Sequence, residues 1–183
     1  MKLAALLLFT SVLTTVLFAE QPRYMGDGQL QRPTGVREWI YLSSGMGMQY
    51  GNGAAGSEFT NVFAEPTAYR EFVKTGKWPE GTMLAMEVRR GESKGSINKD
   101  GRFQTDLLAL EVTVKDTKRF KADGWEYFAF GGKVQTAKGI GQQGGCNACH
   151  NKNAAVENTF GQFYPTILEI ARAKGTVKKT AEE

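Results

Sequence analysis

The two cysteines and the one histidine of this chain stand within five consecutive positions, as Cys146-Asn147-Ala148-Cys149-His150. This C-x-x-C-H spacing is typical of covalent attachment of a c-type haem. Two thiols three positions apart at the start of a helix can each add to one vinyl group of the same porphyrin, and the next residue then directs its imidazole to the iron. The motif predicts one haem c on Cys146 and Cys149, with His150 as the proximal iron ligand. Such a chain has to fold around a large flat cofactor.

Three other interpretations of the motif compete with haem attachment. A structural zinc site needs four ligands, whereas the chain has only three Cys and His residues in total. A thioredoxin-like redox pair is expected near a βαβ unit, and this pair lies near the C-terminus of a pattern dominated by strands. A structural disulfide across so short a loop would leave the adjacent lone histidine unexplained. Haem attachment accounts for all three residues.

The first residues predict export. Lys2 precedes an apolar run from Leu3 to Phe18, which ends at Ala19 before a polar segment. This pattern is typical of a secretory signal peptide, expected at residues 1–19. The alternative is an uncleaved anchor, but a run of about 16 residues is shorter than the roughly 20 that span a bilayer. We expect a periplasmic protein without a membrane span after cleavage, and c-type haem is attached outside the cytoplasm.

The composition argues for one globular domain and against nucleic acid as a partner. Hydrophobic residues make up 41% of the chain and charged residues 23%, which supports a packed core. The formal net charge is only +4, and no dense basic cluster interrupts the mixed distribution of charge.

The pattern of apolar residues predicts an α+β fold: a mainly antiparallel sheet with a few short helices, and a C-terminal helical segment that carries the haem-attachment motif. Pro66 should open a short helix that Gly76 closes, and Pro165 should open the last one, which runs to residue 174 before Gly175. A flexible arm is expected at residues 20–35, one haem domain at 36–175 and a solvated tail at 176–183. Strands are expected at 36–50, 58–64, 82–89, 103–114 and 124–130, and a helix at 151–158.

The single histidine also limits the other axial position of the iron. With His150 on the proximal side, a second histidine ligand from the same chain is excluded, and no methionine follows Cys149. This order excludes the small electron-transfer cytochromes c, and the strand-rich sequence excludes the helical bundle of cytochromes c′. The sixth ligand is left as Met, Lys, Tyr, solvent or none, with Met46 and Met48 as candidate methionines.

Six segments share a pattern that extends beyond the motif, namely VREWIYLSSG (36–45), NVFAEPTAYREFVKTGKWPEGT (61–82), LEVTVKDTKRF (110–120), GWEYFAF (124–130), CNACH (146–150) and NTFGQFYP (158–165). In this order they resemble the cytochrome P-460 family and its relatives, the cytochromes c′-beta. The resemblance implies a haem seated against an antiparallel sheet, with a five-coordinate iron whose open face receives small nitrogen species. In the cytochromes P-460 that face supports hydroxylamine oxidation, and in the c′-beta relatives it binds nitric oxide.

The sequence departs from the P-460 pattern at two positions. The lysine that this family attaches to the porphyrin rim corresponds to Met86, and an arginine of the hydroxylamine-oxidising members corresponds to Thr60. Both changes favour an apolar pocket, in which Met86 would contact the haem edge and Phe59 and Phe63 would cap the iron.

From these features we expect a protein that binds nitric oxide or a similar small diatomic or nitrogenous ligand, with electron transfer to a redox partner protein. Two alternatives stay open: a hydroxylamine oxidoreductase that works without the lysine crosslink, and a simple electron carrier with a methionine sixth ligand. The sequence leaves the oligomeric state open, a homodimer included.

Overall fold

The computed structural model describes residues 19–48, 56–95, 97, 100–141 and 145–178. The expected signal peptide, apart from its last residue, lies outside the described residues, and so does the end of the expected tail. In the part of the chain that is described, no helix combines the length and the apolar character that crossing a membrane requires.

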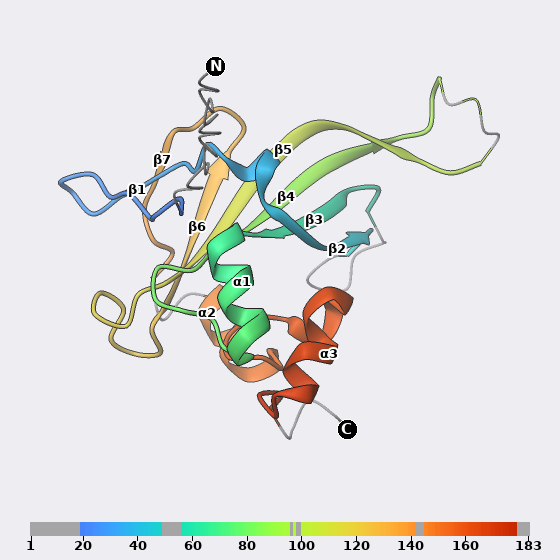
Figure 1. The fold of residues 1–183 in the computed structure, drawn as a ribbon. Helices are drawn as coiled ribbons and strands as arrows, with labels where there is room; N and C mark the ends of the chain where they lie inside the picture. The colour runs from blue at the N-terminus through green and yellow to red at the C-terminus, as the bar shows by residue number, and fades with distance from the viewer. Residues whose placement is uncertain (1–18, 49–55, 96, 98–99, 142–144, 179–183) are drawn as a thin grey trace, which may run out of the picture.

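Five antiparallel strands form the main sheet, in the order in which they follow one another along the chain (Figure 1). A second, two-stranded sheet pairs β1 (Leu30–Gln31) with β7 (Thr136–Ala137). The predicted α+β class with a mainly antiparallel sheet is confirmed. The strands of the main sheet are β2 (Ile40–Met46), β3 (Phe59–Ala64), β4 (Met83–Glu92), β5 (Phe103–Lys115) and β6 (Trp125–Gly131).

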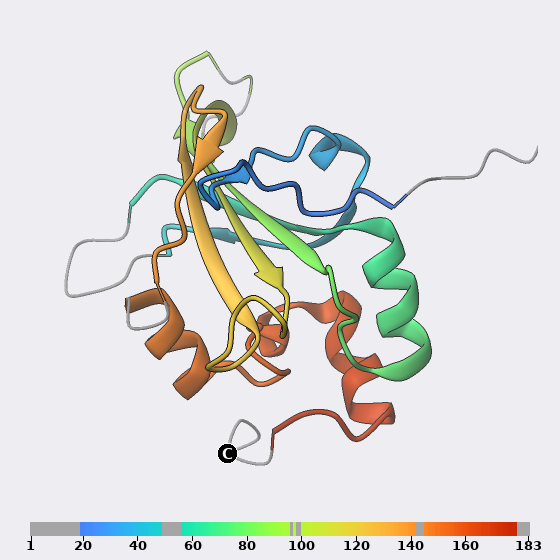
Figure 2. The same ribbon diagram turned by 90° about the vertical axis from the view of Figure 1, so that its left-hand side faces the viewer.

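Three helices gather at one end of the sheet, as Figures 1 and 2 show, and they are α1 (Pro66–Thr75), α2 (Gly145–Asn153) and α3 (Pro165–Ala173). The ends of α1 agree with the prediction. Pro66 occupies the first turn, the Glu65 carboxylate accepts a 2.8 Å hydrogen bond from the Ala68 amide, and Gly76 ends the helix at a φ of 72°.

The two faces of the sheet are packed against different parts of the chain. On one face Leu84, Tyr127 and Ile167 belong to a cluster that the helices complete. On the other face Val112 and Phe128 pack with Leu30 and other residues of the N-terminal segment. Since side chains alternate between faces along a strand, the register of the strands decides which residues can reach the helical side.

The N-terminal segment, which we expected to be a flexible arm, makes several contacts with the rest of the domain. Leu30 is fully buried, and the Glu20 carboxylate accepts hydrogen bonds from the Thr34 and Gly35 amides and from the Trp39 indole. The buried side chain of Leu30 and the hydrogen-bonded amides of Thr34 and Gly35 connect this segment to the domain, although its composition is typical of a loop. The flexibility expected of residues 20–35 stays a prediction.

Several element boundaries also differ from the sequence-based expectation, most of all those of β2 and α2. Residues Val36–Glu38 form a short 3₁₀ turn, and the strand begins only at Ile40. The helix expected after His150 begins earlier, at Gly145, and ends at Asn153. Instead of continuing as a helix, Val156 and Thr159 exchange backbone hydrogen bonds across a two-residue turn. We call residues 156–159 the proximal hairpin.

Candidate functional site

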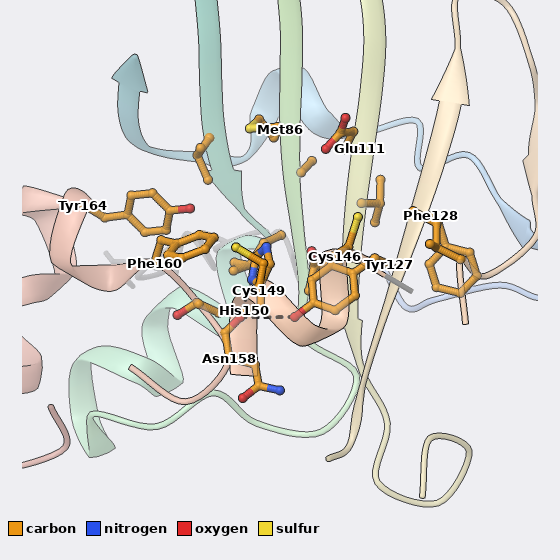
Figure 3. A pocket seen from close by; sticks show the side chains of 18 residues that line it. Met86, Glu111, Tyr127, Phe128, Cys146, Cys149, His150, Asn158, Phe160 and Tyr164 are labelled. Carbon is orange, nitrogen blue, oxygen red and sulfur yellow. Dashed lines mark hydrogen bonds between the residues drawn. The ribbon is translucent and has the colours of Figure 1, made fainter. Parts of the chain in front are cut away.

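A cavity of about 550 Å³ lies between the helical side of the sheet and α2. Its size is in the usual range for small-molecule and cofactor sites, about 300–1,000 Å³. Figure 3 shows Met86 and Glu111 on one side of it, with Cys149 and His150 facing them. The lining residues are Val62, Leu84, Ala85, Met86, Glu111, Val112, Thr113, Tyr127, Phe128, Ile140, Gly145, Cys146, Cys149, His150, Asn158, Thr159, Phe160 and Tyr164.

Helix α2 brings the three motif residues to this cavity. Cys146, Cys149 and His150 fall at positions i, i+3 and i+4 of one helix, which places them on the same face. Both cysteines are free thiols and are partly exposed. Burial, with a smaller contribution from the negative charge of Glu111, raises the pKa of the Cys146 thiol. The helix therefore presents two unpaired thiols and an imidazole to one space.

The imidazole of His150 is fixed from both sides and at one nitrogen. Its ring lies between those of Tyr127 and Phe160, with centroids 4.5 and 4.3 Å away. Its Nδ1–H donates a 2.7 Å hydrogen bond to the carbonyl oxygen of Asn158. Burial lowers the pKa of His150, although this hydrogen bond opposes the shift. A neutral imidazole whose Nδ1 is occupied keeps Nε2 as a lone-pair donor, which is the arrangement that metal-binding histidines use.

One row of side chains crosses the sheet opposite this histidine. Val62 pairs with Met86 across β3 and β4, and Met86 pairs with Glu111 across β4 and β5. Residues paired in this way share a face, and all three line the cavity. Of the methionines that the structure describes, only Met86 lines it. Its thioether is thus part of the wall, next to a carboxylate.

Glu111 is a cavity residue that the sequence did not lead us to expect. Its side chain is open to the cavity, and desolvation by the surrounding protein raises its pKa. Among the described residues it has no ion-pair or hydrogen-bond partner. A signal was present in the sequence, because Glu111 is the one charged residue in the run LLALEVTV of an otherwise apolar strand. Its alternation with Leu110 and Val112 placed it on the face opposite to theirs.

The structure places the other predicted pocket residues outside the cavity. Phe59 and Phe63 lie at odd positions of β3, and Val62 at an even position lines the cavity. Phe63 instead packs against the buried cluster that contains Leu30 and Phe128, next to Arg37 and Tyr41. Strand alternation turns these phenylalanines to the other face, which corrects their expected capping role.

Thr60 shares the face of Val62 but lies one row further along the sheet, where it pairs with Val88. It does not line the cavity either. Met46 and Met48, the candidate sixth ligands, are 62% and 60% exposed and lie outside the lining. The cavity wall opposite His150 therefore consists of Met86, Glu111 and their apolar neighbours.

The residues present fit a haem. Two free thiols and a neutral imidazole face one cavity of suitable volume, and the rest of the wall is mostly aliphatic and aromatic. The imidazole is held in place by contacts within the protein, with Asn158, Tyr127 and Phe160. The donor set therefore matches covalent attachment at one edge and axial ligation from one side.

A family model described as Cytochrome P460 matches residues 33–161, which is more than half of the chain. The matched region includes all five strands of the main sheet, helix α2 and the proximal hairpin. A comparison with the curated proteins found no match.

Proposed function

Because the chain belongs to the cytochrome P460 family, we propose that it carries one haem c on Cys146 and Cys149, with His150 as the axial ligand, and takes a small nitrogen-containing ligand at the open face. The observation that carries this proposal is the arrangement of His150, whose Nδ1–H is committed to the Asn158 carbonyl. When bound, the haem supplies an iron that binds a small ligand and exchanges single electrons. The protein's part is to hold the imidazole and to shape the opposite wall.

That wall favours an uncharged ligand. Val62, Leu84 and Met86 present apolar surface to the cavity, and transfer of a charged or strongly polar molecule to such surroundings is unfavourable unless it finds a partner. Nitric oxide needs no such partner. We therefore propose nitric oxide, or a similar diatomic ligand, as the principal occupant, with an external redox protein as the source or acceptor of electrons.

Glu111 favours a second candidate function, the oxidation of hydroxylamine. Such a substrate loses protons as it is oxidised and so needs a base within the site. The Glu111 carboxylate faces the cavity and has no other partner among the described residues. Since its pKa is raised, the base form is reached at a higher pH than for an ordinary glutamate. Turnover that depends on Glu111 should rise with pH through that raised pKa and then level off.

Two titrations of the loaded protein separate the candidates. The first follows absorption as nitric oxide is added, and the second follows electron release to an artificial acceptor as hydroxylamine is added. Glu111→Gln keeps the shape of the side chain and removes the base, whereas Asp106→Asn removes a carboxylate that is exposed on the same strand. Nitric oxide binding without hydroxylamine turnover supports the first function. Turnover that Glu111→Gln abolishes and Asp106→Asn preserves supports the second.

We also propose that the protein is exported to the periplasm. The charged residue and apolar run at the start of the chain support this, as does the need for haem attachment outside the cytoplasm. The mass of the protein purified from a host that matures c-type cytochromes tests the point. Export with cleavage gives a polypeptide that begins at Glu20, and an intact leader contradicts it.

A further inference from the structure

The backbone at Glu157 is unusual for its residue type. Glu157 is the only residue other than glycine with a positive φ, 49°, in the described part of the chain. It occupies the first central position of the proximal hairpin, where Val156 and Thr159 exchange hydrogen bonds of 3.2 and 2.9 Å. Glycine is the usual residue at such a position, because a side chain is disfavoured there. Local strain of this kind persists only when the surroundings hold it in place.

The side chain of Glu157 supplies that restraint. One carboxylate oxygen accepts a hydrogen bond from the Trp78 amide at 3.2 Å, and the other pairs with Lys115 Nζ at 2.8 Å. Lys115 Nζ also donates to the Trp78 carbonyl at 2.7 Å. Both charged side chains are largely buried, with exposed fractions of 17% for Lys115 and 23% for Glu157. We call Glu157, Lys115 and Trp78 the hairpin clamp.

Trp78 holds the hairpin at a second point. Its ring is buried against Phe72, and its indole N–H donates to the Thr159 hydroxyl at 3.2 Å. The hairpin is thus tied at two residues, Glu157 and Thr159, to a buried part of the core. Between these two ties stands Asn158, whose carbonyl accepts the Nδ1–H of His150.

We propose that Glu157 and Lys115 are positioning residues for His150. Their ion pair holds the proximal hairpin so that the Asn158 carbonyl stays within 2.7 Å of His150 Nδ1. The proposal rests on the proposed function in one respect, that His150 is the axial ligand. A carbonyl that accepts from the far nitrogen fixes the ring orientation and increases the basicity of the ligating nitrogen. Weakening the clamp therefore weakens the bond between the imidazole and the iron.

The test is resonance Raman spectroscopy of the ferrous, loaded protein, which measures the iron–histidine stretching frequency. Glu157→Gln removes one negative charge from the clamp, and Lys115→Met removes one positive charge. Loss of the clamp shifts the band to lower frequency in both variants, whereas a purely electrostatic effect shifts it in opposite directions. Glu157→Gly gives a third variant, because glycine adopts the positive φ without strain and carries no carboxylate.

Glu87→Gln is the matched control. Glu87 is also a buried carboxylate in an ion pair, with Arg89 at 2.9 Å, but it lies on the other face of the sheet and outside the cavity. The expected result is a lower frequency in the three clamp variants and an unchanged band in the control. An unchanged band in Glu157→Gln and Glu157→Gly, opposite shifts in Glu157→Gln and Lys115→Met, or an equal shift in Glu87→Gln overturns the inference alone. Absence of an iron–histidine band in the unmodified protein overturns the axial role of His150 as well.

Discussion

At the scale of single residues, the side chain at position 86 forms part of the cavity wall. Met86 lines the cavity in the row that also contains Val62 and Glu111. No lysine lines the cavity among the described residues. A lysine crosslink to the porphyrin, which resemblance to the cytochromes P-460 implies, thus has no donor in the described wall.

Replacing Met86 by lysine should supply that donor. We expect the amine of Met86→Lys to become linked to the porphyrin rim under oxidising conditions, which would displace the ferrous Soret band and add a lysine–haem peptide to the peptide map. Met86→Leu, a volume-conserving apolar change, is the control and should keep the ordinary haem c spectrum. A displaced band and a lysine crosslink in the unmodified protein would show that another lysine serves instead.

The two cysteines allow a direct count of the covalent links. We expect mass spectrometry under denaturing conditions to find the polypeptide plus one haem when the protein is matured by a cytochrome c assembly system. Cys146→Ser and Cys149→Ser should each keep at most one link, and the double variant should release all haem on denaturation. Polypeptide mass alone from such a host, or bound zinc, would contradict haem attachment.

At the scale of elements, the packing of α1 against the end of α3 is sensitive to a single glycine. Gly76 has a φ of 72° at the end of α1, and a Cβ there would lie 2.6 Å from Lys174 Cβ. Gly175 has a similar φ of 65°, but an added Cβ would meet nothing within 4 Å. Both glycines therefore need a left-handed backbone conformation, but only at Gly76 would an added side chain also collide with a neighbouring residue.

Alanine at these two positions should separate strain from crowding. Gly175→Ala should lower the free energy of unfolding by about 1–2 kcal/mol, the cost of the left-handed backbone for an L-residue. Gly76→Ala should lower it further, because Lys174 or the end of α1 must also move. Chemical denaturation of the loaded protein measures both values. Equal losses would mean that α3 yields to the added methyl group without cost.

The residues of the cavity come from the sheet as well as from the helical side. Helix α2 delivers the thiols and the imidazole, but β4 and β5 deliver Met86 and Glu111, and the proximal hairpin delivers the Asn158 carbonyl. The site is therefore assembled from four elements, which belong to two separate regions of the sequence, β4 and β5 in one and α2 and the proximal hairpin in the other. A change in the register of β5 by one residue would turn Glu111 away from the cavity and replace it with an aliphatic neighbour.

For the whole molecule, the arrangement predicts a resting iron without a strong sixth ligand. His150 is the chain's one histidine, and Met46 and Met48 are exposed and outside the cavity lining. Electron paramagnetic resonance of the ferric protein should show a dominant high-spin signal, which Met46→Leu and Met48→Leu leave unchanged. A low-spin signal that disappears in Met86→Leu would identify Met86 as a ligand.

Much of the fold could be predicted from local patterns. The helix between Pro66 and Gly76, the strands of the sheet and their antiparallel class follow from capping residues and from a two-residue period of apolar side chains. The start of β2 and the end of α2 could not be predicted in this way, because Val36 and Val156 are buried by contacts with distant parts of the chain. Burial of this kind can override local preference for a strand or a helix.

The sequence by itself determined the spacing of Cys146, Cys149 and His150, because residues i, i+3 and i+4 share a face of any helix that contains them. It also determined that Met86 and Leu84 point the same way along their strand. Only the tertiary structure decided which face of the sheet the helices cover, and so placed Glu111 in the cavity and Phe63 outside it. Only the tertiary structure brought the Asn158 carbonyl to His150. The two-residue alternation of side chains along a strand defines the two faces of the sheet. Only long-range packing determines which part of the chain covers each face.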